Sequence, residues 1–199
     1  MNRAAAWALV VVGLVWFVGC GGLASKLNPM SPAERTYWEV ASRYLVRAGV
    51  YQGPATRLII KALPLNWAVR RAQLRREAAA YGWSKTRLSA ALNQAKADSA
   101  KWEEVAIAVF TPNPKANDLD QPNPSWRVYL KAGDKLMAPV DIRALRKRTP
   151  RALMLYPFWD PWSRLYILRF KALGQPKAKL VITGPGGRAE LGLVLRAGH

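Results

Sequence analysis

The sequence predicts an α+β protein in which an N-terminal helical segment precedes a C-terminal antiparallel, β-sandwich-like region. Three observations predict this class. Before about residue 101, apolar residues recur at the three- and four-residue steps of a helix. After Trp102 the period shifts to two, and ten of the 14 prolines follow that residue. Short strand-like runs with frequent turns then fill the remainder, which is typical of a small sandwich or open barrel.

The helical region is expected to span 31–101. Ser31 is a candidate N-cap, with Pro32 in the first turn and Glu34 completing a capping box. An apolar stripe over 37–48 predicts that this helix continues to a stop at Gly49. Further helices are predicted over 56–63, over 66–81 and, after an N-cap at Ser84, to about residue 100.

The β region is expected to span 102–199, with strands predicted over 105–110, 126–131, 165–170, 179–183 and 188–195. The last two flank a glycine cluster at 184–187, which predicts a hairpin turn. A phosphate cradle is excluded there because a strand follows the glycines, and such a cradle needs a helix N-terminus. The Pro-rich loop at 111–125 has a length that is typical of functional or disordered loops.

The charge balance is strongly basic throughout the chain. Its 199 residues include 31 Lys plus Arg against 12 Asp plus Glu, a net charge of +19. Such a surface favours anionic neighbours, for example phospholipid head groups, acidic envelope polymers or nucleic acid.

Two clusters of cations and one aromatic segment are the candidate binding features. The first cluster is a candidate anion-binding patch, because like charges that lie close together repel one another unless an anion binds between them. It consists of Arg143, Arg146, Lys147, Arg148 and Arg151. The second, Arg70, Arg71, Arg75 and Arg76, spreads over a wide arc of a helix and is interpreted as a solvated face. The aromatic residues between 156 and 166 are expected to be buried against the β core.

The sequence predicts no catalytic residue, no metal site and no cofactor. The one histidine is the last residue, His199, and the acidic residues are scattered. Asp118 and Asp120 form a small oxygen-rich cluster, but it lacks the glycine turn and distant Glu of a calcium loop. We interpret it as a solvated turn.

The N-terminus has the parts of an export signal. Arg3 is followed by an apolar or small run from Ala4 to Gly19, too short for an ordinary membrane-spanning helix. Val18, Gly19 and the only cysteine, Cys20, resemble the bacterial lipobox, although Phe17 replaces its usual Leu. The alternative interpretation is an uncleaved signal anchor.

The lipoprotein resemblance implies removal of residues 1–19 and acylation of Cys20 by a thioether-linked diacylglycerol, usually with a third acyl chain on its amine. Two or three chains anchor a protein firmly. Residues 20–30 would then form a tether. Gly21, in place of the Asp of a retention signal, implies the outer membrane, with the folded part in the periplasm or at the cell surface.

Three functions remain open from the sequence. The leading hypothesis is a non-enzymatic, membrane-anchored envelope lipoprotein that binds or assembles through a basic surface. Its expected partners are membrane lipid through Cys20, anionic head groups or envelope polymers, or another protein. A surface-exposed nucleic-acid binder fits the charge but is disfavoured by the export signal, and it predicts a steep salt dependence. An envelope hydrolase would need two carboxylates across one cleft.

Overall fold

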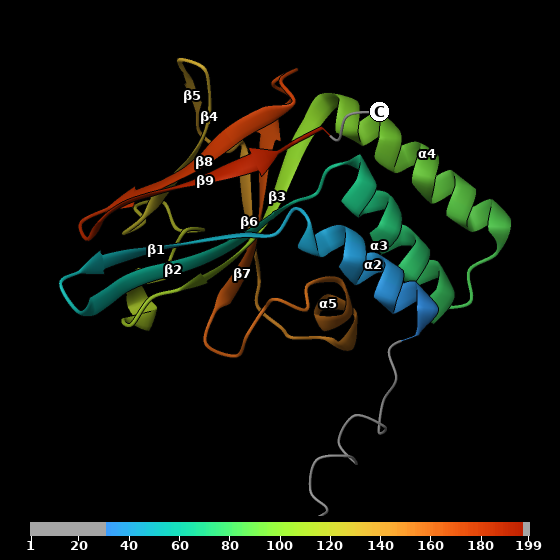
Figure 1. Cartoon of the computed structure of the whole chain (residues 1–199), viewed down its shortest axis with the longest axis horizontal. Helices are drawn as coiled ribbons and strands as arrows, with labels where there is room; N and C mark the ends of the chain where they lie inside the picture. Colours follow the sequence, from blue (N-terminus) through green and yellow to red (C-terminus); the bar gives the residue numbers. More distant parts are fainter. Residues whose placement is uncertain (1–30, 197–199) are drawn as a thin grey trace, which may run out of the picture. The chain divides into compact units, whose positions relative to one another are not determined.

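The computed structural model describes residues 31–196, and it is a mixed α/β structure with two antiparallel sheets (Figure 1). The predicted leader over residues 1–19, the predicted lipidation site Cys20, the predicted tether and His199 lie outside the described residues. Of the described residues, 33–196 belong to one compact unit. Within 31–196, none of the helices combines the length and apolar character needed to cross a membrane.

The elements of the first half are mixed rather than purely helical. In chain order they are α2 (Pro32–Ser42), β1 (Val46–Gln52), β2 (Ala55–Pro64), α3 (Trp67–Ala80), α4 (Lys85–Lys101) and β3 (Trp102–Phe110). The second half follows with η1 (Pro114–Ala116), β4 (Arg127–Ala132), β5 (Lys135–Met137), β6 (Asp141–Leu145), α5 (Pro150–Leu155), β7 (Arg164–Lys171), β8 (Lys177–Gly184) and β9 (Gly187–Val194).

These elements form a five-stranded sheet and a four-stranded sheet. We call the first, in the order β1-β2-β3-β7-β6, the central sheet. The second, in the order β5-β4-β8-β9, is called the outer sheet. Because β2 pairs with β3, strands from the two predicted regions share the central sheet.

Two helix predictions are wrong in the first half. The first helix ends at Ser42, and 46–52 is strand β1 instead of its continuation. The segment predicted as a helix over 56–63 is strand β2. Both faces of β2 are covered, since Leu58 and Ile60 belong to one hydrophobic cluster and Leu63 to another. A strand covered on both faces does not alternate, and its apolar run resembles a buried helix.

The structure confirms the helices and strands that are predicted from short sequence signals such as N-caps and glycine turns. Asn66 caps α3 by accepting the Val69 amide at 3.1 Å, and Ser84 caps α4 by accepting the Arg87 amide at 3.1 Å. The predicted strands correspond to β3, β4, β7, β8 and β9, and the glycine cluster forms the β8–β9 turn. Residues 111–125 hold only the short helix η1.

Two hydrophobic clusters build the core. The first contains side chains of both sheets, among them Ile60, Ile107 and Leu168 of the central sheet and Leu130, Leu180 and Leu191 of the outer sheet. The second lies on the other face of the central sheet, where Leu63, Ala106 and Ile167 meet residues of α2 and α5. Figure 1 shows α2, α3 and α5 grouped on one side of the strands.

Glu103 is a buried carboxyl on the same face of β3 as the first cluster. Its side chain is only 8% exposed, and its Oε1 atom has no hydrogen-bond partner. The nearest cation is Arg196, whose Nε lies 3.8 Å away. Burial raises the pKa of Glu103, against the opposing charge of Arg196 and a hydrogen bond from the Leu173 backbone. The folded state therefore favours the neutral acid.

Glu103→Gln is expected to stabilise the fold at about pH 7, by about 1 kcal/mol, because no charge is then buried. A pKa raised by folding means that the wild type loses stability as pH rises through the ordinary Glu pKa. The gain of the variant should thus disappear at about pH 3. Urea unfolding at both pH values measures this. Glu190→Gln is the control, and it should not stabilise the fold at about pH 7, because hydrogen bonds from Lys179 and Arg188 lower the pKa of Glu190 and favour its charged form. A larger gain for Glu103→Gln in acid would contradict the prediction.

Candidate anion-binding pocket

The structure brings the two basic clusters of the sequence together. A pocket of about 320 Å³ lies between α3, β6 and α5. Arg70 of the second cluster lines it together with Arg143 and Arg151 of the predicted patch. We call this cavity the arginine pocket, and its neutral polar lining consists of Gln73, Thr149 and Tyr156.

Helix α3 presents one face to the arginine pocket. The lining residues Arg70, Gln73, Leu74 and Glu77 recur at helical three- and four-residue steps. The start of the helix is fixed twice by Asn66, which caps it and also donates from Nδ2 to the Val194 carbonyl oxygen at 3.0 Å. The inward face of α3 is mostly polar, because three of its five buried residues, Gln73, Arg76 and Glu77, are polar or charged, and the helix lacks the apolar stripe that usually marks a packed helix.

Helix α5 is held in place by buried polar contacts to α2 and α3. The Tyr37 hydroxyl donates to the Leu155 carbonyl oxygen, and Gln73 Nε2 lies 3.4 Å from the same oxygen. Tyr37 is completely buried and Gln73 is 1% exposed. Burial raises the pKa of Tyr37 to about 12. The hydroxyl thus stays protonated as a donor, and it fixes the residue beside Tyr156.

The charges of the arginine pocket are only partly neutralised. Arg151 Nε binds Glu77, and this hydrogen bond raises the pKa of the guanidinium. Arg70 binds Glu104, which also accepts Arg169 at 2.8 Å. The exposed side chain of Arg143 has no ion-pair or hydrogen-bond partner among residues 31–196. One guanidinium is therefore available to a ligand.

Tyr156 supplies a second available donor. The residue is only 7% exposed, and its hydroxyl makes no hydrogen bond to another described residue. Burial raises the pKa of Tyr156, although the positive charges of Arg70 and Arg143 act against it. The hydroxyl is therefore protonated at neutral pH and can donate to a bound group.

This arrangement can bind an anion by charge-assisted hydrogen bonds. A guanidinium presents donors in a planar fork that matches a carboxylate or a phosphate group. The carboxylate in the pocket, Glu77, is engaged by Arg151. The geometry thus favours binding of a small anionic group over acid–base chemistry.

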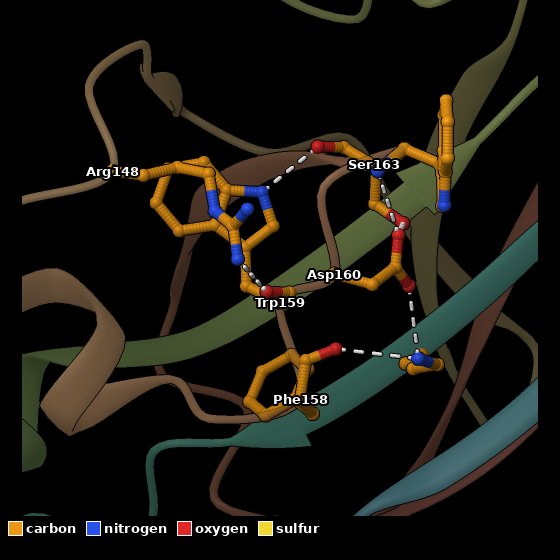
Figure 2. A network of polar contacts seen from close by, with 7 residues as sticks. Arg148, Phe158, Trp159, Asp160 and Ser163 are labelled. Atoms are coloured by element: carbon orange, nitrogen blue, oxygen red, sulfur yellow. Dashed lines mark hydrogen bonds and ion pairs between the residues drawn. The ribbon is translucent and has the colours of Figure 1, made fainter.

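The other members of the predicted patch lie outside this pocket. Arg146 forms an exposed ion pair with Asp120 at 3.3 Å, which contributes little to stability. Lys147 is exposed. Arg148 donates to the Trp159 carbonyl oxygen at 3.0 Å, and its guanidinium lies 5.6 Å from the Trp159 ring centroid (Figure 2). Arg148 therefore holds a loop in place, and the five cations do not form a single surface.

Figure 2 shows how that loop is fixed. Asp160 accepts Ser163 Oγ at 2.7 Å and pairs with Lys61 at 3.0 Å. The aromatic residues Tyr156, Phe158, Trp159 and Tyr166 are buried, as predicted. The prediction is wrong for Trp162, which is 79% exposed at the turn.

The acidic residues singled out in the sequence are engaged by other side chains. Both Asp118 oxygens accept from Ser125, at 2.9 and 3.0 Å. No group of three or more His, Cys, Asp or Glu side chains within 31–196 could hold a metal ion. Asp98 and Glu104 line a pocket of about 300 Å³ beside α4, where two arginines bind Glu104.

Sequence reasoning missed Gln73, Thr149 and Tyr156 as pocket residues. One local signal existed, since Thr149-Pro150 is an N-cap followed by proline in the first turn and marks the start of α5. No protein-family model, curated protein or solved structure matches the chain.

Tyr37→Phe is expected to destabilise the protein by about 1–2 kcal/mol, because the Leu155 carbonyl loses a buried donor. Amide hydrogen exchange in α5 should accelerate in the same variant. Tyr44→Phe is the matched control, because the Tyr44 hydroxyl has no hydrogen bond to another described residue. Equal stability of the two variants in urea unfolding would contradict the role given to Tyr37.

Proposed function

We propose that this chain is a lipoprotein of the bacterial outer membrane that binds an anionic partner, without catalysis, in the arginine pocket. The observation that supports binding is Arg143, a guanidinium without a carboxylate partner beside two further arginines and the Tyr156 hydroxyl. The lipobox-like sequence before Cys20 supports the membrane anchor. We also infer that the two sheets are the layers of a β-sandwich, since both contribute to one hydrophobic cluster.

The tether gives the folded part room to reach a ligand. Residues 20–30, fully extended, span at most about 40 Å. Acyl chains on Cys20 would fix one end of this segment in the bilayer. The folded unit, beginning near Ala33, could then bind a group at the membrane surface or one in the surrounding compartment.

A phosphate or carboxylate group is the ligand chemistry that the pocket fits best. Arg143 can bind two oxygens of such a group side by side, and the Tyr156 hydroxyl can bind a third. A pocket of about 320 Å³ accommodates a small anion or the anionic end of a larger molecule. Envelope polymers and head groups both carry such ends.

The anchor is tested by mass spectrometry of the native N-terminus. The expected product begins at Cys20 and carries acyl chains on its sulfur, whereas a Cys20→Ser variant should accumulate as the uncleaved precursor. Lipoprotein processing needs the thiol, so the serine variant is a matched control. Recovery of the wild type with Met1 intact and an unmodified thiol would contradict the lipoprotein assignment.

The pocket is tested by titrating the folded protein with inorganic phosphate and pyrophosphate in a calorimeter. Arg143→Gln is expected to weaken binding at least about tenfold, because it removes a charge-assisted, two-point contact. Lys147→Gln, which removes the same charge outside the pocket, should change the affinity less than about twofold.

Three results of this titration would contradict the pocket proposal. The wild type could bind neither probe, or the two variants could lose affinity equally. Tighter binding of duplex DNA with a steep salt dependence, unaffected by Arg143→Gln, would favour the nucleic-acid alternative.

A further inference from the structure

The outer sheet has a second basic surface, distinct from the arginine pocket. Its inward side chains belong to the hydrophobic cluster between the sheets, and its outward side chains come from alternate positions of the same strands. We call these outward residues the basic sheet face. Its cations are Arg127, Lys131, Lys177, Lys179 and Arg188, and its one carboxylate is Glu190.

The strand register places like charges next to each other on this face. Lys131 of β4 lies directly opposite Lys179 of β8, a cross-strand arrangement that destabilises a sheet. Glu190 accepts Lys179 at 3.1 Å and Arg188 at 2.6 Å, so it already serves two cations. No ion pair to Arg127, Lys131 or Lys177 is found within 31–196. The face therefore retains excess positive charge.

A shallow hollow lies among these lysines. It measures about 630 Å³, and Lys131, Lys177 and Lys179 border it together with Gly192. No heavy atom lies within 4 Å of the position that a Cβ of Gly192 would occupy. A side chain added at Gly192 would consequently project into the hollow without a steric clash.

We propose that the basic sheet face rests on the anionic head groups of a phospholipid bilayer. The positive charge of the face complements the negative charge of the head groups, and each cation near such a surface adds to the attraction. The flexible lysine ammonium groups, spread over two strands, suit a mobile array of head groups better than one fixed anion. Leu136 of β5, opposite Lys131, is 56% exposed and adds an apolar contact at the edge of the face.

The observations favour a bilayer over single-stranded nucleic acid. Non-specific binding of single strands needs a row of exposed aromatic rings on which successive bases stack. The basic sheet face has a single aromatic side chain, Tyr129, and it is only half-exposed. A Tyr among lysines is instead common where a protein meets a membrane interface. Binding through the basic sheet face does not require acylation of Cys20.

The test is lysine labelling of the full chain on vesicles, read by mass spectrometry. Vesicles of phosphatidylcholine alone are compared with vesicles that also contain phosphatidylglycerol. On the anionic vesicles, labelling of Lys131, Lys177 and Lys179 is expected to slow at least about threefold. Lys85 and Lys96 on α4 are internal controls, because both are exposed on an element that contributes nothing to this face.

Two variants separate charge from shape at the hollow. Gly192→Glu should abolish most of the protection by placing a carboxylate among the lysines, whereas Gly192→Gln adds nearly the same volume and should retain it. Circular dichroism of both variants checks the fold. Equal loss of protection in both would overturn the electrostatic explanation.

The remaining outcomes also decide the proposal. Equal labelling on the two vesicle types, or protection of Lys85 and Lys96 instead, would overturn it. Protection by inorganic phosphate on neutral vesicles would assign the face to a small anion, and protection by DNA but not by anionic vesicles would assign it to nucleic acid.

Discussion

The buried Leu155 carbonyl, bound by Tyr37 and Gln73, is the contact on which the candidate site depends. Helix α5 has only six residues, and a helix of that length is not stable by itself in water. Its position must come from contacts with its neighbours. This carbonyl links the end of α5 to α2 and α3 at once, so the residues on either side, Arg151 and Tyr156, reach the pocket from a fixed backbone.

A buried polar contact of this kind is directional where hydrophobic packing is not. Leu155 and Ala152 belong to the second hydrophobic cluster, and apolar contacts of this kind set the orientation of a helix less strictly than a hydrogen bond does. Only one rotation places the Leu155 carbonyl oxygen at the Tyr37 hydroxyl, and any other would leave buried polar groups unsatisfied. The polar inward face of α3 therefore specifies geometry at the site, which explains why it departs from an apolar stripe.

The elements that the sequence predicted are those whose signals are local. Asn66 and Ser84 cap their helices through contacts three residues away, and the β8–β9 turn needs only its own glycines. The sequence predicts a helix in place of strand β2, because the residues of β2 pack against both hydrophobic clusters, and that packing exists only in the assembled fold. The arginine pocket was divided between two clusters, since nothing local indicates that Arg70 meets Arg143 across about seventy positions of the chain. Candidate cations were thus visible in the sequence, but their grouping required the tertiary structure.

The two basic surfaces differ in the kind of cation that they use, and this suggests different roles. In the arginine pocket, Glu77 orients Arg151 and Glu104 orients Arg70, and the unpaired Arg143 presents its planar guanidinium beside them, which suits recognition of a single anionic group. The basic sheet face uses mainly lysines with little orientation, which suits a diffuse negative surface. The pocket lies on the helix-covered face of the central sheet, and the basic sheet face lies on the far side of the shared cluster. If the sheet face rests on a bilayer, the shared cluster and the central sheet separate the arginine pocket from that bilayer.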